Sequence, residues 1–183
     1  MIICDIPLKG ASIIRSTPST DDRGSFARFF CEKDLKNLIG VHHIVNVNYS
    51  NTIKKGAIRG LHFQYPPKAE MKMVRCIKGS VYDVIVDIRN GSPTFLRWYG
   101  IILSAKNMKM MFIPEGFAHG FQVLTPNSEM LYLHTEFYAP DLESGLRYND
   151  PLLDITWPLE QTDISEKDRR YPLINKEYSG VTV

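Results

Sequence analysis

The sequence predicts an all-β protein, a sandwich or barrel with a few short helices, on three observations. Short apolar runs recur along the chain, Gly, Pro and Asn turn residues separate them, and helical periodicity is confined to two short stretches. A chain of 183 residues is long enough to bury a sizeable core. We therefore expect one domain covering residues 1–183.

The first element with a clear pattern is helical. Residues 32–39 place Leu35, Leu38 and Ile39 on one side, and Gly40 follows directly. An apolar stripe at this spacing with a glycine after it is typical of a short amphipathic helix that ends at residue 39.

The clearest strand covers residues 81–88. Its alternation gives one wholly apolar face, made of Tyr82, Val84, Val86 and Ile88, which suits a sandwich core. The other face carries Asp83 and Asp87, and it either lines a pocket or faces solvent. We expect both carboxylates to be structural. Turn residues at 78–80 and 90–93 bound the strand.

Four more apolar runs follow at similar intervals, at residues 95–103, 109–113, 120–124 and 130–137. Regular spacing of this kind is typical of a β-sandwich or barrel. A second short helix is expected to begin near Ser165. The final residues, about 170–183, are expected to form a loosely held tail.

The composition narrows the class of protein. Hydrophobic residues make up 44% of the chain, and 22 basic against 20 acidic residues give a net charge of +2. With no basic run interleaved with aromatics, we expect no nucleic-acid partner. Without an apolar stretch of spanning length or a signal peptide, we expect a cytoplasmic protein that does not enter membranes. The three cysteines lack Cys-x-x-Cys spacing, which favours reduced thiols.

Two histidines carry the chemistry. His62 lies in the segment 59–64 and His119 in the segment 114–121, each between glycines and large apolar residues. Such a histidine can exchange a proton near neutral pH or bind a metal, and we expect one pocket with two imidazoles. Lys72, Tyr132 and Asp168 add a cation, a phenol and a carboxylate. These are the groups needed to move a proton beside a carbonyl.

The order of these motifs resembles the dTDP-4-dehydrorhamnose 3,5-epimerase family of nucleotide-sugar epimerases. The resemblance runs from Asp21 to about Asp168 through the segments 21–26, 59–64, 72–74, 82–84, 86–89, 91–94, 103–107, 113–121, 149–151, 157–158 and 165–168, with Tyr132 and Tyr138. It implies a cupin-type jelly-roll barrel, a homodimer, and no metal or other cofactor. The implied reaction is epimerisation at C3, C5 or both of a nucleotide-diphospho-4-keto-6-deoxy sugar. The implied substrate and product are dTDP-4-dehydro-6-deoxy-D-glucose and dTDP-4-dehydro-L-rhamnose.

The resemblance also implies residue roles. His62 would remove the proton beside the C4 ketone, with Asp168 as its partner, while Lys72 would stabilise the enolate oxygen and Tyr132 would return a proton to the opposite face. Inversion requires this second group, since a single base would restore the starting configuration. The implied substrate-binding residues are Arg23, Phe26, Arg28, Asn46, Asn48, Arg59, His119, Tyr138, Glu143 and Lys167. Among them Arg23 and Arg59 suit a diphosphate.

Some residues have a second interpretation. Asp168 could simply serve the first turn of the helix capped by Ser165, and Tyr138 could pack in a core. We expect His134 to be a surface or structural residue. A metal-dependent cupin oxygenase or isomerase using His62, Glu70 and His119 is the alternative function, because the Pro-x-Gly-x-x-His element of metal cupins occurs at 114–119.

Three positions depart from the family pattern. Arg28 stands where the family usually has Glu, Asn46 where it has Gln, and Glu70 where it often has Gln. The first two family residues contact the nucleotide near the thymine, so we expect weaker selectivity for dTDP. Glu70 is close enough in sequence to pair with Lys72.

Overall fold

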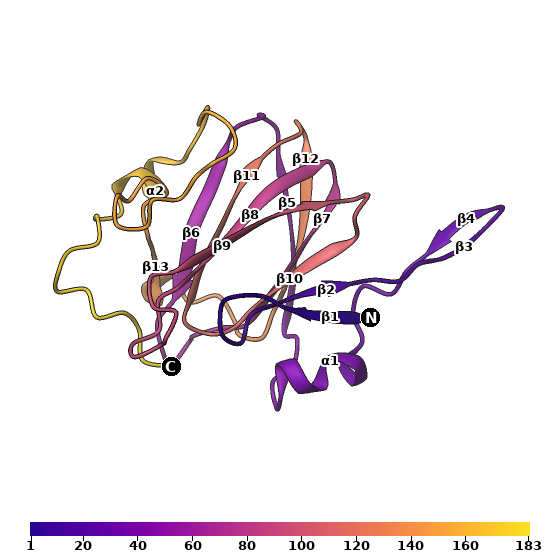
Figure 1. The fold of residues 1–183 in the computed structure, drawn as a ribbon, viewed down its shortest axis with the longest axis horizontal. Helices are drawn as coiled ribbons and strands as arrows, with labels where there is room; N and C mark the ends of the chain where they lie inside the picture. The colour runs from indigo at the N-terminus through magenta and orange to yellow at the C-terminus, as the bar shows by residue number, and fades with distance from the viewer.

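The computed structural model describes residues 1–183 as two antiparallel sheets packed face to face (Figure 1). The larger sheet has the order β1 (Ile2–Asp5), β2 (Ser12–Arg15), β10 (Lys109–Ile113), β7 (Lys72–Lys78), β12 (Ser128–His134) and β5 (Asn46–Thr52). The smaller sheet has the order β13 (Glu143–Gly145), β6 (Ile58–Gln64), β11 (Phe117–Val123), β8 (Ser80–Asp87) and β9 (Trp98–Ser104). The all-β prediction is thus confirmed.

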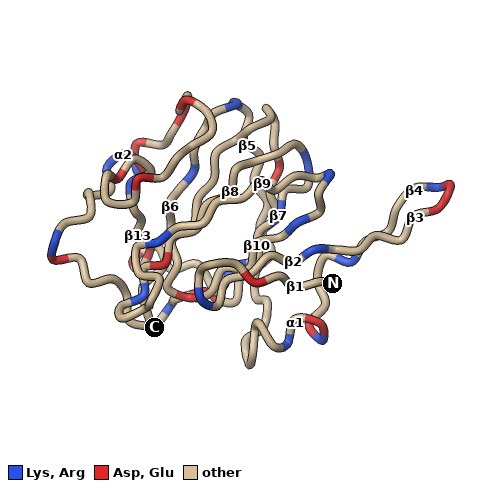
Figure 2. Tube along the Cα trace, in the orientation of Figure 1, with Lys and Arg blue, Asp and Glu red and all other residues tan.

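The remaining elements lie outside the two sheets. A hairpin of β3 (Ser19–Asp21) and β4 (Gly24–Phe26) projects away from the body (Figure 1). The helices are α1 (Glu32–Ile39), the 3-10 turn η1 (Pro140–Leu142) and α2 (Glu166–Arg170). Both predicted helices are confirmed, although neither is long and apolar enough to cross a membrane. Acidic and basic residues are interspersed along the whole chain (Figure 2).

The main core fills the space between the sheets. Val74, Met111 and Met130 of the larger sheet meet Ile85 and Phe121 of the smaller one, and all five side chains are almost fully buried. Successive strand residues point to opposite faces of a sheet. The alternate residues of these strands therefore face outward and need a cover of their own.

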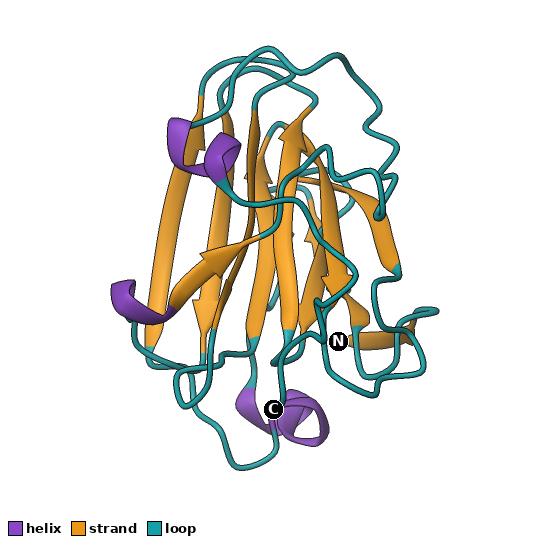
Figure 3. Cartoon of the chain, turned by 90° about the vertical axis from the view of Figure 1, so that its left-hand side faces the viewer, coloured by secondary structure: helices purple, strands orange, loops and turns teal.

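Each outer face has such a cover. On the larger sheet α1 packs Leu35 and Ile39 against Met73, Met110 and Leu133. On the smaller sheet the chain after β13 packs Leu146, Leu153 and Val181 against the outward residues of β8. In Figure 3 the helices and long loops lie outside the strands.

This second cover corrects the interpretation of β8. The apolar face of Val84, Val86 and Ile88 is the outer face of the sheet, and the Asp83 face points into the sandwich. Alternation identified the two faces but not which one the other sheet would cover, because both are buried. The last residues also differ from expectation. Val181 is 3% exposed, and its N–H donates to the Ile88 carbonyl at 2.7 Å, so this part of the tail is packed.

Several strands begin or end at residues other than those predicted. β10 spans the predicted 109–113, whereas β9 begins at Trp98 because residues 92–97 form turns. β11 begins three residues early, at Phe117, and β12 ends at His134. The earlier start of β11 matters for the site, because it places His119 within the strand.

Two glycines let β6 and β11 approach closely beside the site. A Cβ on Gly60 would lie 2.6 Å from the His119 carbonyl oxygen, and a Cβ on Gly120 would lie 2.5 Å from that of Arg59. Gly60 also has a φ of +108°, which other residues rarely adopt. The register of the two strands shifts between His119 and Phe121. Glycine is therefore required here to bring both histidine segments together.

Candidate active site

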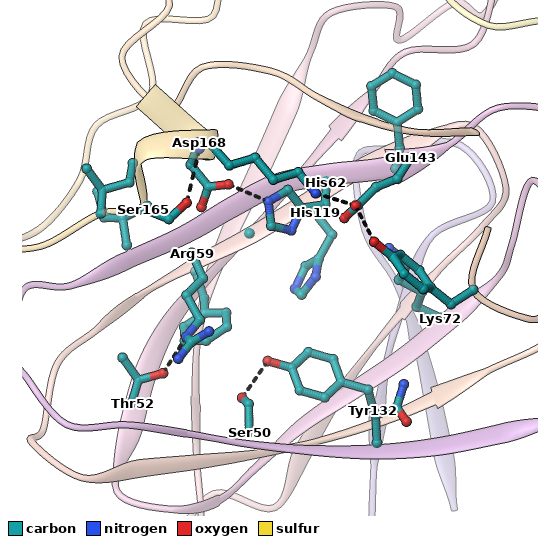
Figure 4. Close-up of a pocket in the computed structure, with 18 of the residues that line it drawn as sticks. Ser50, Thr52, Arg59, His62, Lys72, His119, Tyr132, Glu143, Ser165 and Asp168 are labelled. Carbon is teal, nitrogen blue, oxygen red and sulfur yellow. Dashed lines mark hydrogen bonds and ion pairs between the residues drawn. The ribbon is translucent and has the colours of Figure 1, made fainter. Parts of the chain in front are cut away.

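A cavity of about 620 Å³ lies between the sheets, lined by residues of both (Figure 4). The smaller sheet contributes His62 from β6 and His119 from β11, and the larger sheet contributes Lys72 from β7 and Tyr132 from β12. Asp168 reaches the cavity from α2. The structure thus brings together all four residues predicted to be catalytic, with both predicted imidazoles.

His62 and Asp168 form a short hydrogen-bonded pair, in which His62 Nε2 donates to Asp168 Oδ1 at 2.7 Å. The Gly60 N–H donates to Asp168 Oδ2 at 3.1 Å, and the Ser165 hydroxyl accepts from the Asp168 N–H as the cap of α2. Burial opposes ionisation of Asp168, but the bonds from His62 and Gly60 outweigh it and lower the pKa of its carboxyl. A carboxylate at Nε2 leaves Nδ1 of a neutral His62 unprotonated, as a base requires.

The cap contact also answers the rival interpretation of Asp168. Its backbone serves the first turn of α2 while its side chain reaches His62, so the two roles coexist. Tyr171 follows the helix and meets the His62 ring edge-on, with ring centroids 6.1 Å apart.

Tyr132 approaches the cavity from the opposite sheet. Its hydroxyl lies 2.9 Å from the hydroxyl of Ser50 on β5. Burial raises the pKa of Tyr132 to about 12, despite the contact with Ser50. The phenol therefore stays protonated near neutral pH, in the form that can donate a proton.

Lys72 belongs to a buried polar cluster. Its Nζ lies 2.9 Å from Glu70 Oε1, and the other carboxylate oxygen accepts from Nδ1 of His134 at 2.7 Å. Burial disfavours the Glu70 carboxylate, yet the bond from His134 and the charge of Lys72 lower its pKa. The pairing of Glu70 with Lys72 confirms the expectation from sequence. The expected surface or structural role of His134 is incomplete, because His134 lines the cavity.

His119 is held by a second carboxylate. Its Nε2 lies 2.8 Å from Asp83 Oδ2, and both side chains are almost fully buried. Its ring meets the Tyr132 ring edge-on at a centroid distance of 6.4 Å. This contact gives Asp83 a structural role, as expected. Asp87 also has one, since it accepts from Arg89, Ser92 and Thr94 outside the cavity.

Glu143 joins two further predicted binding residues at the rim of the cavity. It accepts a hydrogen bond from the Tyr138 hydroxyl at 2.8 Å and forms an ion pair with Lys167. Burial of Glu143 is outweighed by the bond from Lys167, so its pKa is lowered, while the same bond raises the pKa of Lys167. Tyr138 is 64% exposed, which excludes the packing interpretation in this chain.

Arg59 and Asn48 also line the cavity. The Arg59 Nε donates to the Thr52 hydroxyl at 2.8 Å, which fixes the guanidinium at the end of β5 (Figure 4). Asn48 is the direct cross-strand neighbour of Tyr132.

Four predicted binding residues lie elsewhere. Arg23 and Phe26 are on the projecting hairpin, where Arg23 pairs with Asp21 and Phe26 is 78% exposed. Arg28 follows the hairpin and lies 3.7 Å from Asp34 of α1. Asn46 donates to the Glu136 carbonyl at 3.3 Å. None of the four lines the cavity of its own chain.

Sequence reasoning missed Ser50 and the inward position of His134. Both could have been found from strand periodicity, because Ser50 is two residues from Asn48 and His134 two residues from Tyr132.

The metal-dependent alternative lacks the donor set that it needs. No group of three or more His, Cys, Asp or Glu side chains is arranged to hold a metal ion. Glu70 faces Lys72 and His134, and His119 faces Asp83. An ammonium competes with a cation for the same carboxylate, so these residues do not form a facial triad.

The two facing sheets, with a cavity that holds a histidine–carboxylate pair and a buried phenol, define a β-sandwich protein whose site suits proton transfer. The chain matches the sequence pattern of the dTDP-4-dehydrorhamnose 3,5-epimerase family over residues 5–176, and it belongs to that family. The predicted family, fold class and enzyme class are thereby confirmed.

Individual proteins similar to this chain support the same family assignment. The dTDP-4-dehydrorhamnose 3,5-epimerase of Salmonella typhimurium is 40% identical over 178 residues, covering 96% of this chain and 97% of that protein. The crystal structure of the Bacillus anthracis enzyme with TDP and PPi bound has a TM-score of 0.91 at 41% identity, covering 94% of this chain and 99% of that one. A Legionella pneumophila enzyme in complex with dTDP-4-keto-L-rhamnose has the same TM-score at 39% identity, covering 100% and 98%.

Proposed function

We propose that this protein epimerises C3 and C5 of dTDP-4-keto-6-deoxy-D-glucose to give dTDP-4-keto-L-rhamnose. The main support is that a base and an acid lie on facing sheets. His62, paired with Asp168, projects from the smaller sheet, and Tyr132 projects from the larger one into the same cavity (Figure 4). A sugar ring between the sheets would meet each group on a different face.

At each of the two carbons the chemistry runs in two proton transfers. Nδ1 of His62 takes the proton from the carbon next to the C4 ketone, and Asp168 stabilises the imidazolium that forms. Electrons move onto the ketone oxygen, where the Lys72 ammonium stabilises the enolate. The Tyr132 hydroxyl gives its proton to the other face of the same carbon. Its phenolate can accept a bond from Ser50, and exchange with solvent restores both groups.

Substrate binding is assigned to the groups around this centre. Arg59 suits the diphosphate, because a guanidinium offers paired donors to phosphate oxygens. The nucleotide would enter over the rim formed by Tyr138, Glu143 and Lys167. The sugar would lie against Asn48 and His119, which also line the cavity.

We also propose a homodimer in which the hairpin of each chain completes the cavity of the other. The Arg23 side chain is 90% exposed, and Phe26 has no core to pack into. Val47 and Tyr49 on the outward face of β5 are also exposed, at 61% and 57%. Exposed apolar side chains in such number favour an interface. Light scattering should give twice the chain mass, and a monomer that turns over substrate normally would contradict the dimer.

Proton NMR in D₂O tests the reaction. With dTDP-4-keto-6-deoxy-D-glucose, deuterium should replace the carbon-bound hydrogens at C3 and C5 while the L-rhamno product accumulates. Exchange at one carbon alone would restrict the activity to that centre. A folded protein that exchanges neither hydrogen would exclude the proposed function.

A further inference from the structure

We infer that Glu70 is a positioning residue that fixes the Lys72 ammonium for the reaction, through a carboxylate shared with His134. The inference rests on the proposed function, in which Lys72 stabilises the enolate. In this role Glu70 acts through Lys72 and does not contact the reacting carbon.

The carboxylate bridges two partners with its two oxygens. Oε1 lies 2.9 Å from Lys72 Nζ and Oε2 lies 2.7 Å from His134 Nδ1. The side chains of Glu70, Lys72 and His134 are 8%, 10% and 15% exposed. All three line the cavity. The cluster is therefore buried, yet it belongs to the wall that the substrate meets.

Backbone pairing places the three side chains of this bridge. Lys72 and His134 are direct cross-strand partners on β7 and β12. The loop before β7 is fixed by the Met71 N–H donating to the Thr135 hydroxyl at 2.9 Å and by the Thr135 N–H donating to the Met71 carbonyl at 3.1 Å. Glu70 is thus held at the end of the strand pair, within reach of both side chains. Two neighbouring groups that can each carry positive charge favour an anion at this place.

The bridge restricts the position of a flexible lysine side chain. Its four-carbon stem is flexible, whereas electrostatic stabilisation of an enolate requires a donor fixed before the charge develops. One N–H of Lys72 directed to Glu70 orients the ammonium, and two of its three donors remain for the substrate. Without the carboxylate the ammonium would be free to turn away from the ketone oxygen.

Replacing Glu70 tests the inference. Glu70→Ala should lower kcat by roughly 10- to 100-fold, the cost of misplacing a catalytic group. The Kd for dTDP should stay at the parent value, because Arg59 and the rim residues are unchanged. Glu70→Gln keeps an acceptor oxygen at the same reach and should recover much of the lost rate. Glu70→Asp, one methylene shorter, cannot span both partners and should resemble Ala. It replaces the Ala variant if that variant does not fold.

A matched control and a double mutant separate positioning from a structural role. Glu129→Gln removes a carboxylate that pairs with Lys78 at 2.9 Å, on the same two strands but outside the cavity, and should keep the parent kcat. In a Lys72→Met background, Glu70→Ala should cause no further loss of rate, since Glu70 acts through Lys72. A further loss of the same size there would assign Glu70 a role independent of Lys72 and overturn the inference.

Loss of the proposed function and loss of the Glu70 role alone give different experimental results. Absence of carbon-bound exchange in the unmodified protein would remove the proposed function, and with it this role of Glu70. An active parent whose Glu70→Ala and Glu70→Asp variants keep full kcat would overturn the inference alone.

Discussion

Asp168 accepts a 2.7 Å hydrogen bond from Nε2 of His62, although 106 residues separate them in the chain. The short helix α2 makes this contact possible, because its Ser165 cap accepts from the Asp168 N–H and turns the carboxylate toward β6. The Gly60 N–H holds the second carboxylate oxygen. One side chain from a covering segment thus fixes the ring of a histidine in the cavity wall.

Asp168→Asn is expected to lower kcat by about 10²–10⁴-fold, the range for losing acid–base catalysis. An amide cannot stabilise the imidazolium and no longer enforces the tautomer with Nδ1 free. His62→Ala should fall in the same range, and combining both changes should add little. Calorimetry with dTDP should show unchanged binding in each variant. Near-normal turnover by folded His62→Ala would show that another group is the base.

Tyr132→Phe separates the two proton transfers. His62 is intact in this variant, so proton removal and return on one face should continue, and deuterium should still enter the substrate. Inverted product should fall by about 10²-fold or more, because the acid on the other face is gone. Ser50→Ala serves as a comparison and should lose less. Equal loss of exchange and inversion would contradict separate roles for His62 and Tyr132.

Asp87→Asn should destabilise the fold by about 3 kcal/mol at neutral pH, the cost of breaking a buried ion pair. Burial alone would raise the pKa of Asp87, but the hydrogen bonds from Arg89, Ser92 and Thr94 outweigh it and lower the pKa of this carboxyl from its usual value. A carboxyl whose pKa is lower in the folded state stabilises the protein at pH values above its unfolded-state pKa. This stabilisation disappears as the pH falls through the folded-state pKa. Urea unfolding should therefore show a smaller difference between parent and variant near pH 3 than near pH 7. A constant difference would exclude this linkage.

Chelation should leave the epimerase activity unchanged, because the carboxylate of Glu70 is already engaged by Lys72 and His134. Exhaustive dialysis against EDTA, followed by the exchange assay and metal analysis, provides the measurement. Activity that is lost and then restored by iron, manganese or zinc would favour the metal-dependent alternative.

Much of the fold follows from local pattern. The stripe of Leu35, Leu38 and Ile39 predicted α1, and alternation predicted β8. Alternation could not identify the inner face of β8, since the chain after β13 buries the outer face as thoroughly as the larger sheet buries the inner one. The packing of Val181 was not predicted either, because the polar residues around it give no apolar pattern.

The site was less accessible to local reasoning. No spacing rule relates His62 to Asp168, so their pairing came from resemblance to the family alone. By contrast, strand period alone could have placed His134 beside Tyr132. The hairpin residues Arg23 and Phe26 are a third case, because their place in the chain's own structure does not reach the cavity.

Two residues bear on the choice of nucleotide. Arg28 is 61% exposed at its side chain, lies 3.7 Å from Asp34, and belongs to the segment that would reach a second copy in the proposed dimer. Arg28 offers only hydrogen-bond donors where the family usually has an acceptor, and Asn46 is one methylene shorter than the family Gln. We therefore expect weaker discrimination among dTDP, UDP, CDP and GDP than is usual for the family, with CDP- or GDP-sugars accepted.

Calorimetry of the four nucleotides against the parent and Arg28→Glu tests this expectation. The substitution should shift preference toward dTDP, since it restores the acceptor carboxylate. Lys33→Glu makes the same change of charge on the exposed side of α1 and should leave the preference unaltered. A parent protein that already prefers dTDP strongly, with the same preference after Arg28→Glu, would show that Arg28 does not contact the base.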